Sequence, residues 1–133
     1  MEFDFLSPVS DNLLDEITHL NAQTIGAQLK LHTSEHGLPD LDKVNVAIFG
    51  VRENRRAVRE DSTPDFESLR RQLYSLYPGN WRLNLADLGD IQEGDAVEDT
   101  YYAVSKLCAD LIKQDIIPVI LGGSQDLIYA QYR

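Results

Sequence analysis

The stretch Ile116-Ile-Pro-Val-Ile-Leu-Gly-Gly-Ser-Gln-Asp126 decides the fold that we expect for this chain. Its first six residues are almost wholly apolar, which is typical of a strand that is covered on both faces. Pro118 is tolerated near the start of such a strand. Gly122-Gly123 then turns the chain, and Ser124 is a suitable N-cap for a following helix. The stretch therefore predicts an interior strand that leads directly into a helix.

A strand and a helix of the same kind come first in the sequence. Val44-Asn-Val-Ala-Ile-Phe-Gly-Val51 is a short apolar, β-branched run and predicts a buried strand. A helix should begin at Thr63 as N-cap, with Pro64 at its first position, and end before Tyr77-Pro-Gly-Asn80. The apolar stripe of this helix is predicted to be Phe66, Leu69, Leu73 and Leu76.

A second strand and helix follow. Arg82-Leu-Asn-Leu-Ala-Asp87 alternates polar and apolar residues, which indicates a strand near a sheet edge, with Leu88-Gly-Asp90 as its exit loop. Residues 95–114 predict a longer helix, in which Asp95 and Glu98 can form a capping box. Its apolar stripe is read as core: Val97, Tyr101, Val104, Leu107, Cys108 and Leu111.

The order βαβαβα over residues 44–133 predicts the α/β class, with a parallel sheet flanked by helices in three layers. Residues 1–43 form an N-terminal helical or irregular segment, where Ser10 or Asp11 can cap a helix. The apolar side of that helix is Leu13, Leu14, Ile17 and Leu20. From Gln23 to His36 the pattern fits a helix and a strand equally.

Composition excludes several classes of partner and location. The length of 133 residues suits one domain. Twenty-two acidic against twelve basic residues give a net charge of -10, so we expect neither nucleic acid nor an anionic membrane as a partner. Cys108 is the single cysteine and is predicted to be a buried, inert thiol. The amino terminus lacks a signal-peptide pattern and no apolar run approaches a membrane span, which predicts a cytoplasmic protein.

Ligands of an open parallel sheet bind beyond the carboxyl ends of its strands. The loops that follow the predicted strands are residues 52–62, 87–94 and 122–126. In the first of these loops, Arg52, Asn54 and Arg55 are candidates for binding a substrate carboxylate. A surface loop of paired charges is the alternative. The glycine turn at residues 122–124 can bind an anion or simply pack tightly, and it matches no phosphate-loop motif.

Four features, in this order, resemble the ureohydrolase family of arginases, agmatinases and formimidoylglutamases. That family has an apolar strand ending in Gly-Val, a Pro-x-x-Ile-Arg helix, an Asp-Leu-Gly-Asp segment and a Leu-Gly-Gly-Asp-His-Ser motif. The corresponding segments here are Phe49-Gly50-Val51, Pro64-Asp-Phe-Glu-Ser-Leu-Arg70, Asp87-Leu-Gly-Asp90 and Leu121-Gly-Gly-Ser-Gln-Asp126. The resemblance covers residues 44–133 and implies a partial arginase-like fold.

The resemblance implies hydrolysis of a guanidino or formimino group by a hydroxide that bridges two manganese ions. Gln125 stands where the family has a ligand histidine, and Asp126 stands in the same metal motif. An amide is a poorer ligand than an imidazole, and Asp126 equally suits the first turn of a helix. The family's other metal motifs, Asp-x-His-x-Asp and Ser-x-Asp-x-Asp, do not occur before Arg133. Manganese is therefore expected only in a full-length parent, and no cofactor in this chain.

Two functional hypotheses follow. The chain is the amino-terminal fragment, itself inactive, of an arginase-family hydrolase that acts on C–N bonds of an amidino or guanidino compound. Alternatively, the parent keeps the fold without a metal site and serves as a binding or assembly subunit. An unrelated nucleotide or flavin binder is a third, weaker reading. The chain stops inside a predicted helix, which suggests truncation at residue 133, and the apolar strand at residues 116–121 predicts homo-oligomerisation. His19, His32 and His36 precede the first strand and are predicted to be surface or packing residues.

Overall fold

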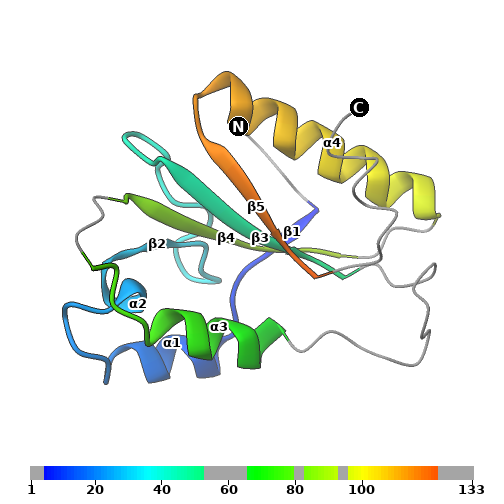
Figure 1. Cartoon of the computed structure of the whole chain (residues 1–133). Coiled ribbons are helices and arrows are strands. Elements are labelled where there is room, and N and C mark those ends of the chain that lie inside the picture. Colours follow the sequence, from blue (N-terminus) through cyan, green and yellow to red (C-terminus); the bar gives the residue numbers. More distant parts are fainter. Residues whose placement is uncertain (1–4, 53–65, 80–82, 93–95, 123–133) are drawn as a thin grey trace.

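The computed structural model describes residues 5–52, 66–79, 83–92 and 96–122, which form an α/β structure with one sheet between helices (Figure 1). The strands are β1 (Leu6–Ser7), β2 (Lys30–Leu31), β3 (Val46–Val51), β4 (Leu85–Ile91) and β5 (Ile117–Leu121). The helices are α1 (Asp11–Ile17), α2 (Ile25–Gln28), α3 (Phe66–Tyr74) and α4 (Val97–Lys113). Helix α4 lies on one face of the sheet, and α1, α2 and α3 lie on the other.

The sheet has the order β1-β4-β3-β5, and β2 also pairs with β4. Strand β3 is parallel to both β4 and β5, and β2 is parallel to β4. Strand β1 runs antiparallel to the end of β4. The predicted parallel arrangement therefore holds for β2 to β5, while the segment before residue 44 adds an antiparallel strand that the sequence did not reveal.

The prediction that the second strand lies at a sheet edge was wrong. Strand β4 is flanked by β3 on one side and by β1 and β2 on the other, and all its residues after Leu85 are buried. The predicted exit loop Leu88-Gly-Asp90 is part of the strand. The cause is the amino-terminal segment, which covers the outer side of β4. Residues 23–36, which fitted helix and strand equally, contain one of each, α2 and β2.

Strand β5, predicted to be interior, lies at the edge of the sheet in the part of the chain that the structure describes. Its Ile117 and Val119 side chains are 62% and 40% exposed. Pro118 is compatible with this place because an edge strand does not need every backbone donor. Self-association through this apolar edge stays a prediction.

The helices follow the predicted periodicity with two exceptions. The predicted stripe of α4 is confirmed at Val104, Leu107, Cys108 and Leu111, which are buried, and Tyr101 packs partly buried against the same core. The side chain of Val97 lies outside the described residues. Its first turn differs, since the carboxylate of Asp99, not Glu98, accepts the backbone N–H of Ala96. No helix within the described ranges is long and apolar enough to cross a membrane.

Helix α3 is the second exception. Its predicted start at Thr63 and Pro64 lies outside the described residues. Its buried residues are Phe66, Arg70 and Tyr74, whereas the predicted stripe residues Leu69 and Leu76 are exposed. The face that α3 turns to the sheet therefore carries a guanidinium and a phenol.

The start of α1 and the state of Cys108 both agree with the sequence. Ser10, one of the two predicted alternatives, is the N-cap of α1, and its hydroxyl oxygen accepts a hydrogen bond from the Leu13 N–H at 3.2 Å. Burial raises the pKa of the Cys108 thiol to about 11, in agreement with the predicted inert thiol.

A β-bulge at Gly89 decides which face of the sheet carries the acidic residues of β4. Ile48 of β3 pairs with Asp87, and Gly50 pairs with Asp90, so β4 has one residue more than β3 between these pairs. Gly89, with φ +87°, is the residue that takes up the difference. Side chains alternate between faces along a strand, so residues three apart would normally point in opposite directions. The bulge brings both carboxylates to the α3 face.

Replacing Gly89 tests this role. A Cβ atom at Gly89 would lie 1.9 Å from the carbonyl oxygen of Ser7, so Gly89→Ala must displace β1 or the bulge. We expect the free energy of unfolding to fall by about 3 kcal/mol or more. Gly37→Ala is the matched control, because Gly37 has φ +72° with nothing within 4 Å of its added Cβ. The free energy of unfolding of that variant should fall by only about 1–2 kcal/mol, which is the backbone strain of an alanine at positive φ. Equal losses in urea denaturation would contradict the role of the bulge.

Candidate functional site

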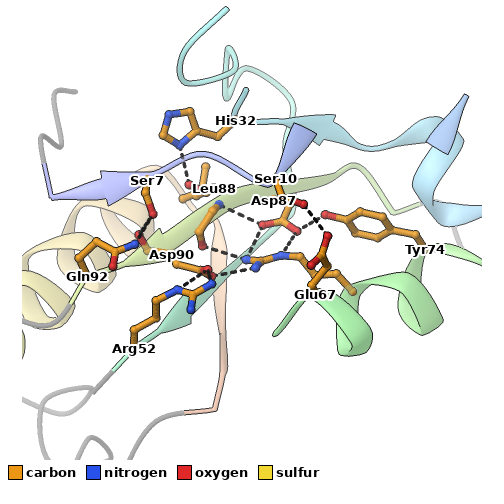
Figure 2. A network of polar contacts seen from close by, with 12 residues as sticks. Ser7, Ser10, His32, Arg52, Glu67, Tyr74, Asp87, Leu88, Asp90 and Gln92 are labelled. Atoms are coloured by element: carbon orange, nitrogen blue, oxygen red, sulfur yellow. Dashed lines mark hydrogen bonds and ion pairs between the residues drawn. The ribbon is translucent and has the colours of Figure 1, made fainter. Parts of the chain in front are cut away.

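A buried ion network joins α3 to β4 (Figure 2). The Arg70 side chain is only 3% exposed. Its Nε donates to Asp87 Oδ2 at 2.7 Å, and its Nη2 donates to Asp87 Oδ1 and to the Gly89 carbonyl oxygen, both at 3.0 Å. Its Nη1 lies 2.8 Å from Asp90 Oδ1. The guanidinium is thus charge-compensated by two carboxylates that the bulge has brought together.

Asp87 has no capacity left for a ligand. Oδ1 accepts hydrogen bonds from Arg70 and from the Gly89 N–H, and Oδ2 accepts from Arg70 and from the Tyr74 hydroxyl. These four bonds use the lone-pair positions that a carboxylate offers. Asp87 is therefore a structural anion.

Burial lowers the pKa of Arg70, but the charge of Asp87 and its hydrogen bonds, with those of Asp90, outweigh burial and raise that pKa. The guanidinium stays charged. Burial, followed by the charge of Asp87, raises the pKa of the Tyr74 hydroxyl well above its ordinary value, so this hydroxyl stays protonated and remains a donor.

Asp90 connects the buried network to Arg52 at the end of β3. Arg52 places Nε at 3.0 Å and Nη2 at 2.9 Å from Asp90 Oδ2. The guanidinium also lies over the Phe66 ring, with Cζ 5.5 Å from the ring centroid, in cation–π contact. A Cβ at Gly50 would lie 2.3 Å from Asp90 Oδ1, so only glycine fits there. Arg52 is held in place on two sides.

A cavity of about 220 Å³ lies beside this network, at the carboxyl ends of β3 and β4. The amino-terminal segment forms one wall and α3 contributes another. The described residues that line it are Ser7, Pro8, Val9, Ser10, Leu13, Arg52, Glu67, Arg70, Asp90 and Gln92. Ser10 donates to Glu67 Oε1 at 2.8 Å, and Ser7 donates to the Asp90 carbonyl oxygen at 3.2 Å. The cavity is the candidate ligand site.

Of the predicted carboxylate-binding residues, Arg52 lines this cavity, while Asn54 and Arg55 lie outside the described residues. Gln125 and Asp126, at the place of the family's first metal motif, also lie outside them. In the ranges that the structure covers, no group of three or more His, Cys, Asp and Glu residues is placed to hold a metal ion.

The histidines behave as predicted. His19 and His36 are exposed, and His32 is buried beside β4. His32 Nδ1 lies 2.8 Å from the Leu88 carbonyl oxygen. Since a carbonyl only accepts, Nδ1 carries the proton, and the ring serves packing.

Sequence reasoning pointed to Arg52, which lines the cavity, but missed Arg70 and Tyr74 of the buried network. The signal was present: Phe66, Arg70 and Tyr74 recur every four residues, so they share one helix face. Two carboxylates in a predicted strand supply the opposite charge. A buried arginine would follow from combining these two observations.

Comparison with protein-family models, with curated proteins and with solved structures found no match to this chain.

Arg70→Met tests the buried network. Removing one partner of a buried ion pair leaves Asp87 and Asp90 uncompensated, and we expect a loss of about 3–5 kcal/mol in the free energy of unfolding. The matched control is Arg71→Met, because Arg71 is the next residue along α3, is 46% exposed and pairs with Glu16. This control should leave the urea midpoint nearly unchanged. The network idea fails if both variants unfold at the same urea concentration.

Alkaline pH tests the buried phenol. The folded-state pKa of Tyr74 is raised above the unfolded value of about 10, so its contribution is present below pH 10 and is lost as pH rises. We expect the stability advantage of the wild type over Tyr74→Phe to shrink by about 1.4 kcal/mol per pH unit above pH 10. Ionisation of Cys108 lowers the stability of both proteins over a similar pH range, so its effect cancels in the comparison. A stability difference between wild type and Tyr74→Phe that stays constant from pH 9 to pH 11.5 in urea denaturation would refute the role of the buried phenol.

Proposed function

We propose that residues 44–133 form the amino-terminal part of an arginase-like domain, and that the complete domain hydrolyses a C–N bond of an amidino or guanidino compound. One observation supports the fold part of this proposal. The motif residues that suggested the family pack against one another: Gly50 against Asp90, Arg70 against Asp87, and Gly122 against Phe66, whose ring lies 2.3 Å from where a Gly122 Cβ would be. Four matches that are weak singly thus lie in one set of contacting residues, of which Phe66, Arg70, Asp87 and Asp90 are buried.

The described residues do not fit a manganese centre. Asp87 is fully hydrogen-bonded and Asp90 is engaged by two arginines. Gln125 offers a neutral amide in place of an imidazole. In this proposal the 133-residue chain is inactive alone. It contributes the scaffold and, through Arg52, Asn54 or Arg55, contacts to a substrate carboxylate.

A second candidate function, a binding or assembly subunit without a metal, is favoured by the hydrogen bonding of Asp87 and by Gln125. If the complete domain has no metal site, the fold serves as a non-catalytic binding or assembly subunit. The saturation of Asp87 and the presence of Gln125 support this alternative, because each removes a carboxylate or imidazole that a metal would use. The hydrolase candidate takes a small-molecule substrate as its partner.

Metal content and product release separate the two candidates. The complete protein that contains this chain, purified without chelators, should retain about two manganese ions per chain. It should also release urea or formamide from guanidino or formimino substrates. The isolated 133-residue chain is the control and should do neither. A complete protein that holds no manganese and releases neither product would remove the hydrolase proposal and leave the binding subunit.

A further inference from the structure

We propose that the cavity between the amino-terminal segment, α3 and the ends of β3 and β4 binds a small zwitterion, whose carboxylate contacts Arg52 and whose cationic nitrogen contacts Glu67. This inference does not need the hydrolase proposal to be correct, because a metal-free domain can hold the same ligand. It rests on the geometry of the two side chains.

Arg52 is pre-organised for a carboxylate. Its Nε and Nη2 are fixed on one oxygen of Asp90, and the Phe66 ring lies against the guanidinium. Within the described ranges Nη1 has no partner, and the side chain is 43% exposed. A guanidinium held along one side still offers its Nη1 and Nη2 hydrogens as a fork that matches a carboxylate. Little conformational entropy is lost on binding, since the side chain is already ordered.

Glu67 supplies the opposite charge. It lies in the first turn of α3 and its side chain is 40% exposed. Oε1 accepts from the Ser10 hydroxyl and lies 3.6 Å from Arg71 Nη2. Oε2 has no partner among the described residues, so it can accept hydrogen bonds from an ammonium or a similar cation.

Charge balance favours a ligand that carries both signs. The charged side chains that line the cavity are Arg52, Arg70, Glu67 and Asp90, so their formal charges cancel and a ligand without net charge keeps the balance. The wall formed by Pro8, Val9 and Leu13 is apolar and suits a methylene chain. At about 30 Å³ per water, the cavity of about 220 Å³ has room for roughly seven waters, or a ligand of on the order of ten non-hydrogen atoms.

Three probes of matched chain length test the proposal on the 133-residue chain: 5-aminopentanoate, pentanoate and pentylammonium. Calorimetric titration should show that 5-aminopentanoate binds at least about tenfold tighter than either singly charged probe. Amide chemical shifts of Ser7, Ser10 and Gln92 should change on titration. Equal binding of all three probes, shifts elsewhere, or no binding at about 10 mM would overturn the proposal.

Two variants assign the charges. Glu67→Gln keeps an acceptor for Ser10, and should reduce the affinity for 5-aminopentanoate to that for pentanoate. Arg52→Lys keeps a positive charge beside Asp90, and should weaken 5-aminopentanoate binding about tenfold by removing the fork. Glu98→Gln, on α4 across the sheet, is the matched control and should bind as the wild type does. If Glu98→Gln loses as much affinity as Glu67→Gln with unchanged urea midpoints, the assignment is wrong.

Discussion

The guanidinium of Arg70 is withdrawn from water beneath α3, and the structure on that side of the sheet depends on compensating its charge. Removing such a group from water costs several kcal/mol unless opposite charges meet it with good geometry. Asp87 provides two hydrogen bonds and Asp90 a close ion pair, and the two carboxylates share one face because β4 bulges at Gly89. The closeness of Asp90 then requires a glycine at position 50. One buried charge thus accounts for Asp87, Gly89 and Asp90 in β4 and for Gly50 in β3.

The same network reaches the solvent through Asp90. Its Oδ1 lies against the buried arginine of α3, and its Oδ2 holds Arg52 at the cavity. The scaffold and the candidate site therefore share a residue, and the orientation of Arg52 follows from the packing beneath it. A substitution of Asp87 or Tyr74, which do not line the cavity, would therefore change the cavity through the residues that do.

The spacing of apolar residues along the sequence predicted the elements whose burial depends on their own residues. Strand β3 and helix α4 follow from runs of apolar residues, and Arg52 follows from its place after a strand. The interior position of β4 could not be predicted in this way. An aspartate in a strand is usually taken to face solvent, whereas Asp87 is buried because it pairs with Arg70 of α3. Strands β1 and β2 have two residues each, too few to show a period. Tyr74 was missed because the leucines of α3 suggested a different buried face.

The pairing of β1 with β4 has a consequence for how the protein is made. Ser7 and Asp90 are 83 positions apart, and β1 also closes the cavity wall. A ribosome delivers β1 well before β4, so β1 has no partner until β4 has emerged. Closing so long a loop is entropically unfavourable until the intervening elements are in place. Strand β1 is thus made long before its partner but paired late, and during that interval its apolar residues are open to chaperones and proteases.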